Sequence, residues 1–377
     1  MAGKIRVRLY NILLGDAILV TLPGKPKQHI LIDVGNKPGG IGADKSLFEP
    51  IIKNIIKELA GAPLDLYVMS HEHMDHVQGM LYASEKLGID IKKTLAPKYV
   101  WLTASAAPNY YDEHEDAKKQ KSLALAAYDH ALRFFAGEPP PFMATLLALN
   151  DPRTTDDCVD YLRKLSAKTY YVHRQTKQLA AKHALKDATI SIWAPEEDTS
   201  IYYGRFDPAA LAMGEKFAAA AGSSPDDILP PRGVDTGAFY NLVRSRANGI
   251  AGNLLEIDKA ANNTSVVFCL QANGKKLLFP GDAEERSWQE MDKRGLLEPV
   301  DFLKIAHHLS HNGTPSEELV DKLLPNDGKK RQAAVSTCEH AYSGIPDGPT
   351  KKLIQKRATL FDTMTDSKPG EWGDVMV

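Results

Sequence analysis

The stretch Ser70-His71-Glu72-His73-Met74-Asp75-His76 decides the fold prediction, because it places four potential metal ligands within six residues. It directly follows the apolar run 64–69, which is typical of a short buried strand. Because His71 and His73 are two positions apart, they project from one side of an extended segment. The other two ligands follow where the chain turns into a helix. Ligands just beyond a strand end have the rigid support that an α/β layered fold gives to a binding site.

The residue types in this stretch suit a transition metal, since imidazole and carboxylate groups are preferred ligands of zinc, manganese and iron. His71 and His73 can bind one ion while Asp75 and His76 bind a second. A His-rich surface loop is the alternative interpretation, and the position after an apolar strand makes it the weaker one. The stretch therefore predicts a centre for two divalent ions.

Strand and helix patterns at both ends of the chain flank a largely helical middle. Apolar and β-branched runs predict strands at residues 5–10, 16–22, 29–34, 64–69, 168–172, 188–193, 265–270, 276–279, 300–305 and 333–336. Helical spacing predicts helices at residues 46–59, 103–149, 207–248 and 283–294. Asn273-Gly274 separates two of the strands and is typical of a tight hairpin turn. Since both ends supply parts of one site, we expect a single domain, 1–377, with helical insertions at about 103–150 and 205–250.

The composition limits the possible partners and compartments of the chain. Its 377 residues are 43% hydrophobic, enough for a large core, and its net charge of -2 gives no global basic field for nucleic acid or membranes. Three widely spaced cysteines predict neither a disulfide framework nor a Cys-rich zinc site. The N-terminus lacks the apolar run of a signal peptide, and no stretch is both long and apolar enough to span a bilayer. We expect a soluble cytoplasmic protein without a membrane partner, and the oligomeric state is left open.

The metal-ligand stretch resembles the metallo-β-lactamase superfamily, and three further motifs extend the likeness. The resemblance implies a four-layered αββα sandwich. Gly281-Asp282 resembles the element of the family whose aspartate bridges the two metals, which gives Asp282 that role. His307-His308 resembles the late His-His element, in which one histidine completes the second metal's ligands. We expect His308 to be that ligand and His307 to support the site or contact substrate, with the reverse assignment left open. Asp33, in an Asp-x-Gly turn, is expected to orient the metal-binding loop by hydrogen bonding.

Within the superfamily, the chain is most similar to the hydrolase domain of the bacterial DNA-uptake channel protein ComEC and its free-standing relatives. The likeness covers residues 1 to about 100 and 255–377 and is weak across the insertions. It rests on four segments: Gly15-Asp16-Ala17-Ile18, Asn263-Thr264-Ser265-Val266-Val267, Leu303-Lys304 before the paired histidines, and 336–346 with His340 and Tyr342. By this likeness, we expect Asn263 and Lys304 to lie behind the metal ligands and support them.

The chain departs from the superfamily pattern at one ligand position. A Gly-His-Thr element usually supplies a further histidine before the hairpin, but this chain has Asn262-Asn263-Thr264-Ser265 there. The first metal would keep His71, His73 and Asp282, with water, an Asn side chain or a distant group as the fourth ligand. The resemblance therefore implies two divalent ions, with zinc as the first expectation and manganese or iron as alternatives. The site of His71 and His73 is expected to bind its ion more weakly.

The expected chemistry is hydrolysis by a hydroxide shared between two metals, which also polarise the electrophile. Asp75 is expected to orient this nucleophile as well as to bind metal. The leaving group needs a proton, and His340 is the first candidate to supply it, followed by His307, because imidazole titrates near neutrality. A structural or solvent-exposed histidine is the alternative for His340.

The likeness favours a phosphodiester substrate, either a small molecule or a nucleic acid, since ComEC-type domains carry the resemblance. Hydrolysis of a lactone, lactam or thioester on the same site is the alternative within enzymes. A binding protein with a partly decayed metal site is the alternative outside enzymes, and redox chemistry at a di-iron version of the site ranks last. The sequence does not distinguish these substrates.

Overall fold

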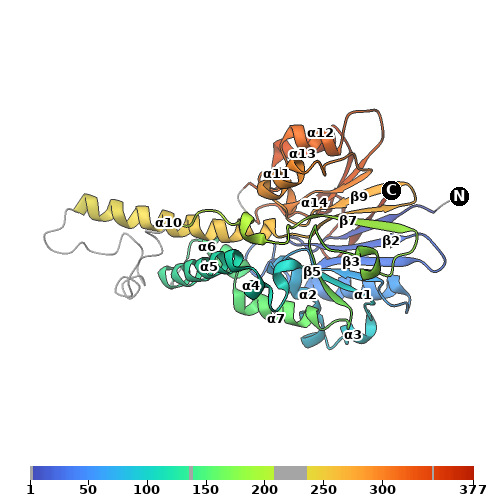
Figure 1. The fold of residues 1–377 in the computed structure, drawn as a ribbon, viewed down its shortest axis with the longest axis horizontal. Coiled ribbons are helices and arrows are strands. Elements are labelled where there is room, and N and C mark those ends of the chain that lie inside the picture. Colours follow the sequence, from blue (N-terminus) through green and yellow to red (C-terminus); the bar gives the residue numbers. More distant parts are fainter. Residues whose placement is uncertain (1–2, 136–138, 208–235, 342–343) are drawn as a thin grey trace.

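Two mixed β-sheets lie face to face, and helices cover the outer face of each (Figure 1). The computed structural model describes residues 3–135, 139–207, 236–341 and 344–377. The resulting order of layers, helix, sheet, sheet and helix, confirms the predicted α/β sandwich. Within the described ranges, no helix combines the length and the apolar character needed to cross a bilayer. Residues 208–235, which lie in the second predicted insertion, and Tyr342 lie outside the described residues.

The first sheet has seven strands and joins the two ends of the chain. Its order is β13 (Trp372–Met376), β1 (Arg6–Tyr10), β2 (Ala17–Leu22), β3 (Gln28–Val34), β4 (Leu66–Val68), β5 (Val100–Thr103) and β6 (Thr169–Val172). The strands from β13 to β3 pair antiparallel, while those from β3 to β6 pair parallel. Parallel pairing brings the carboxyl ends of β3 and β4 to the same edge. Asp33 lies at the end of β3, and the stretch 70–76 follows β4.

The second sheet has six strands and supplies the other half of the sandwich. Its order is β12 (Thr359–Asp362), β11 (Gln332–Val335), β10 (Phe302–Lys304), β9 (Lys275–Phe279), β8 (Val267–Ala272) and β7 (Ala188–Ala194). The predicted hairpin is confirmed, because β8 and β9 pair antiparallel around Asn273 and Gly274. Both turn residues have positive φ, 50° and 70°, as a tight turn between twisted strands requires. Strands β9 to β12 are parallel, so their carboxyl ends also share one edge.

Alternation along the strands builds the layers. In β3, Ile30 and Ile32 face the layer between the sheets, where they join Phe268, Phe279 and other apolar side chains, whereas Leu31 faces outward. The helices outside the first sheet are α1 (Phe48–Leu59), α2 (Met74–Glu85), α3 (Ile91–Thr94) and α7 (Pro152–Arg163). Those outside the second sheet are α11 (Glu285–Lys293), α12 (Glu317–Leu323) and α13 (Gly348–Gln355). Both outer faces of the sandwich are therefore buried.

A helical layer projects from one end of the sandwich (Figure 1). It contains α4 (Tyr110–Glu113), α5 (Glu115–Phe134), α6 (Pro141–Leu149) and α10 (Thr236–Asn263). Tyr128, Leu146 and Leu254 join these helices in a small apolar core of their own. Helix α10 continues to Asn263, well beyond the predicted end at 248, so the segment before β8 is helical rather than extended. That the whole chain forms one domain stays a prediction.

The sequence patterns missed several short elements. These are β5, β12, β13, α3, α7, α12, α13 and α14 (Thr363–Asp366). Short 3₁₀ turns complete the described chain at η1 (Lys45–Leu47), η2 (Ala104–Ala106), η3 (Leu179–Lys182), η4 (Thr199–Tyr202) and η6 (His307–Leu309). Among these, η6 carries the paired histidines His307 and His308.

Candidate metal centre

The metal-ligand stretch lies between β4 and α2, as its sequence predicts. Strand β4 ends at Val68, and α2 begins at Met74 with His73 as its N-cap residue. The stretch is held by close packing against the Asp-x-Gly turn that follows β3. A Cβ atom on Gly35 would lie 2.2 Å from both the carbonyl carbon of Asp75 and the amide nitrogen of His76. Glycine is therefore required for the two backbones to meet.

The second sheet contributes its ligands from the carboxyl ends of β9 and β10. Asp282 follows β9 through a turn at Gly281, which has a φ of +57°. His308 follows β10 within η6 and has a φ of 52°, a left-handed conformation that is uncommon for a residue with a side chain. Two turns with positive φ thus direct these side chains toward the ligands from the first sheet.

Four buried side chains converge at this point: Asp75, His76, Asp282 and His308. One ligand atom from each lies within 4.8 Å of the others. The Asp282 Oδ2 atom lies 3.1 Å from His76 Nε2 and 3.2 Å from His308 Nε2, and His308 Nε2 lies 3.4 Å from Asp75 Oδ2. Two imidazoles and two carboxylates at these separations could hold a divalent metal ion.

Unpartnered buried atoms support this fit. Among the described residues, His71 Nε2 and Asp75 Oδ1 are buried and form no hydrogen bond. Such atoms are costly in a folded protein unless a ligand or water satisfies them. The His71 ring lies 4.2 Å from the His76 ring and 4.7 Å from the His73 ring, between centroids. His71 and His73 therefore lie beside the four-residue cluster, although neither belongs to it.

The electrostatics divide the histidines into two kinds. Burial, together with the neighbouring charges of His76 and His73, lowers the pKa of His71 well below its ordinary value. Burial also lowers the pKa of His76 and His308, but the nearby carboxylates outweigh it, raising the pKa of His308 to about 10 and that of His76 well above its ordinary value. The pKa of Asp282 is held well below its ordinary range because His308 and His76 outweigh the effect of burial. The two carboxylates therefore make this cluster a favourable place for positive charge.

Asp33 holds the ligand loop in the way that the sequence predicts. Its carboxylate accepts hydrogen bonds from Ser70 N at 2.7 Å and Ser70 Oγ at 2.6 Å, and it lies 2.9 Å from His76 Nδ1. The contact at Nδ1 leaves His76 Nε2 to face Asp75 and Asp282. On the other side, His308 Nδ1 lies 3.0 Å from the carbonyl oxygen of Ser336. Both histidines are thus oriented by their second ring nitrogen.

Lys304 and Asn263 support the site from behind, each through one intermediate group. The buried Lys304 ammonium donates to Asp16 Oδ2 at 2.7 Å, and Asp16 belongs to a buried group with Asp33 and His76. Asn263 Oδ1 accepts from Glu284 N at 3.3 Å and Ser287 N at 2.9 Å. It therefore fixes the segment after Asp282 and does not replace the missing histidine ligand.

His73 leads from the cluster toward the helical layer. Its Nε2 atom lies 3.0 Å from Asn150 Oδ1 and 3.7 Å from Asp258 Oδ1, and Asn150 donates to Asp258 at 3.0 Å. These two partners were not predicted. Asp258 is four residues before Asn262, so helical spacing would have placed both on one face if the helix had been predicted to reach residue 263.

The paired histidines take different directions. His308 joins the four-residue cluster, whereas the His307 Nδ1 atom lies 3.0 Å from Glu284 Oε1 and 3.0 Å from Ser310 Oγ. The backbone N–H of His307 donates to Asp282 Oδ1 at 3.2 Å. The geometry thus favours His308 as the ligand, while His307 lies beside the cluster and lines the same cavity.

His340 requires a correction. Its side chain is 77% exposed, and its charged neighbour is Glu339, with 3.9 Å between His340 Nε2 and Glu339 Oε1. It does not line the cavity at the cluster. The prediction that His340 protonates the leaving group is therefore wrong for this arrangement, because a proton donor must reach the reacting atoms.

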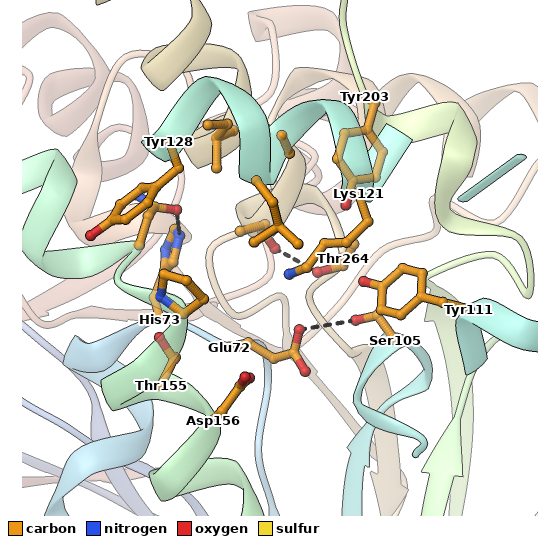
Figure 2. A pocket seen from close by; sticks show the side chains of 16 residues that line it. Glu72, His73, Ser105, Tyr111, Lys121, Tyr128, Thr155, Asp156, Tyr203 and Thr264 are labelled. Carbon is orange, nitrogen blue, oxygen red and sulfur yellow. Dashed lines mark hydrogen bonds between the residues drawn. The ribbon is translucent and has the colours of Figure 1, made fainter. Parts of the chain in front are cut away.

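Two cavities meet at His73. The first, of about 230 Å³, contains Asp75, Asp282, His307 and His308 and is walled by α6 and α10. The second, of about 70 Å³, lies below α5, where Figure 2 shows Glu72 directed at Ser105 and Lys121 reaching in from the helix. It has room for on the order of a few water molecules. Residues 71–76 therefore border the larger cavity on one side and the smaller one on the other.

No protein-family model and no curated protein sequence matches this chain. The function is therefore inferred from the geometry of the site.

Proposed function

We propose that this chain is a metal-dependent hydrolase with a dinuclear centre, which acts on phosphodiester bonds. The observation that carries the proposal is the convergence of Asp75, His76, Asp282 and His308, with ligand atoms within 4.8 Å of one another, at the wall of a cavity. In this proposal Asp75, His76, Asp282 and His308 would hold one ion, and His71 and His73 would help to hold the other. Zinc fits this donor set best, with manganese or iron as alternatives.

The metal pair would supply a nucleophile from water at neutral pH and offset negative charge that develops on the electrophile. Residues of the chain would hold the ligands in place and balance the charge around them. Asp33 and the Ser336 carbonyl fix His76 and His308 through their Nδ1 atoms, and Lys304 neutralises Asp16 beneath the centre. A centre fixed in this way needs little reorganisation when charge develops during the reaction.

The cavity supplies groups for an anionic substrate. Lys259, His311, Asn312 and Ser310 line it together with the cluster. These side chains offer hydrogen-bond donors, which suit the oxygens of a phosphodiester. Lys259 brings a positive charge to the wall, although its ammonium lies 3.2 Å from Glu256 Oε1. A volume of about 230 Å³ favours a small phosphodiester or the end of a longer one over a duplex lying across the site.

A second candidate function is favoured by the opposite wall of the same cavity. Phe142, Leu146, Leu149 and Leu255 make this wall apolar. An apolar wall beside a metal centre suits a lactone or thioester with a hydrocarbon chain, because such a chain is stabilised by burial. The two functions share the centre and differ in which wall binds the substrate.

A direct comparison of substrates tests the proposal. Protein purified without chelator is assayed with bis(p-nitrophenyl) phosphate and, in parallel, with lactone and thioester reporters. We expect phosphodiesterase activity that Asp75→Ala and Asp282→Asn reduce by at least the roughly 10–100-fold that loss of an outer partner costs in metal sites. Asp116→Asn, an exposed change on α5, is the matched control and should leave the rate unchanged.

The results separate the alternatives. Activity that survives both cluster changes would place the reaction elsewhere or in a contaminant. Hydrolysis of the lactone or thioester alone would favour the second function. Cleavage of single-stranded and double-stranded nucleic acid is measured separately, where backbone recognition predicts affinity that falls as salt is raised.

A further inference from the structure

A second group of metal-binding side chains lies beside the dinuclear centre and shares no residue with it. Asp258 comes from α10, Glu284 precedes α11, and His307 belongs to η6. One ligand atom from each lies within 4.8 Å of the others. Three elements that are distant in sequence thus bring two carboxylates and an imidazole to one point.

The amide of Asn262 points at this group and is only partly satisfied. The residue is fully buried, and its Nδ2 atom lies 2.8 Å from Glu284 Oε1, 3.4 Å from Asp258 Oδ2 and 3.5 Å from His307 Nε2. Its Oδ1 atom is buried and has no hydrogen-bond partner in the part of the chain that the structure describes. Because an amide has nearly the same shape after a 180° rotation, the oxygen can replace the nitrogen at this point. The group would then offer three oxygens and one nitrogen.

Among the described side chains, His307 and Lys259 offset part of the negative charge at Glu284. The Glu284 side chain is 5% exposed and that of Asp258 13% exposed, so both carboxylates are largely removed from water. The Lys259 ammonium lies 3.2 Å from Glu256 and is directed to that carboxylate. A divalent cation would offset the charge of both carboxylates. Buried charge without compensation is costly, which favours the cation.

We infer that Asp258, Glu284, His307 and Asn262 bind a third divalent cation, separate from the proposed dinuclear pair. Two carboxylates, an amide oxygen and one imidazole suit Mn²⁺ better than a soft metal. In this arrangement His307 acts as a ligand and not as the proton donor expected from the sequence.

The position of this cation gives it a role at the substrate cavity. Asp258, Glu284 and His307 all line the cavity that contains the dinuclear cluster. Asp258 Oδ1 lies 3.7 Å from His73 Nε2, so the groups that hold the third ion adjoin those of the first. A cation there would bind an anionic part of the substrate or leaving group. This role rests on the proposed phosphodiesterase function, whereas the binding of the cation does not.

Metal counting tests the site without reference to activity. Metal-free protein is dialysed against Mn²⁺, bound metal is measured by elemental analysis, and free Mn²⁺ by electron paramagnetic resonance. We expect three ions per wild-type chain and two in Glu284→Gln and in Asp258→Asn. Glu285→Gln, an exposed neighbour on α11, is the matched control and should bind three. Circular dichroism and a thermal melt establish that each variant is folded.

Each outcome decides one of the two proposals. A wild-type chain that saturates at two ions, or a Glu284→Gln chain that keeps three, overturns the third site. Loss of all metal in both folded variants also overturns it, because the group would then belong to the dinuclear centre. If the wild type binds one ion, which Glu284→Gln loses and Asp75→Ala keeps, the third site holds and the dinuclear proposal fails.

Discussion

Replacing Asp33 with Asn tests how the chain orients His76, a proposed metal ligand. Asp33 contacts the His76 ring and is not itself proposed to bind metal. The buried carboxylate contacts both Ser70 and His76, with 2.9 Å between Asp33 Oδ2 and His76 Nδ1. This contact requires the hydrogen of the imidazole on Nδ1, which leaves Nε2 free to bind metal. An amide keeps one oxygen for the Ser70 N–H but can present its own NH₂ group to Nδ1. His76 would then carry its hydrogen on Nε2, the atom that faces Asp282.

The expected magnitude follows from the contacts that change. Loss of an orienting partner costs about 10–100-fold in metal affinity in other sites, or about 1.4–2.7 kcal/mol. Hydrogen bonds to charged groups contribute about 1.5–3 kcal/mol each to stability. Asp33→Asn weakens the contacts to Ser70 Oγ and His76 and retains the one to Ser70 N, so we expect a loss of about 3 kcal/mol in unfolding free energy.

Metal affinity is measured by competition with a chromophoric chelator, and stability by urea unfolding of the metal-free protein. Asp65→Asn is the control, because Asp65 is a buried carboxylate immediately before β4 that accepts hydrogen bonds from His29 N at 2.8 Å and Lys98 Nζ at 2.7 Å. It should lose stability and keep its metal affinity. Wild-type metal affinity in a folded Asp33→Asn variant would refute the reasoning about His76.

Three further predictions address other parts of the site. Gly35→Ala forces a Cβ atom against the backbone of residues 75 and 76 and should lower the free energy of unfolding in urea by about 3 kcal/mol. A loss below about 1 kcal/mol would contradict the close packing. His340→Ala should retain wild-type kcat with the preferred substrate because the side chain is on the surface, and a large loss would restore its predicted role. Metal binding should release protons at pH 7, since the raised pKa values keep His76 and His308 protonated in the metal-free protein and coordination needs them neutral. Calorimetry in buffers of different ionisation enthalpy should therefore show proton release and a metal affinity that rises with pH. A metal affinity that stays constant from pH 6 to 8 would contradict this prediction.

Much of the centre could be predicted because its groups follow strands. His71, Asp282 and His308 each come just after an apolar run, and parallel strands bring their carboxyl ends to one edge of a sheet. The turn at Asn273-Gly274 likewise identified the hairpin that positions Asp282. In these places a local pattern contains the information that fixes the geometry.

The parts that failed depend on contacts between distant segments. The sequence does not show where α10 ends, and without that end Asp258 and Asn262 could not be placed on one face near His73. Asn150 lies just after α6, and its contact with His73 follows from how the helical layer packs. His340 was chosen by residue type, and nothing local shows that its loop directs it to solvent.

Anomalous diffraction from crystals grown with zinc tests the central claim most directly. Data collected on both sides of the zinc absorption edge locate each bound ion without reference to any reaction. We predict one peak among Asp75, His76, Asp282 and His308, and a second between Asp282 and the His71–His73 side. Crystals that contain zinc but show no peak within bonding distance of Asp282 would contradict the account.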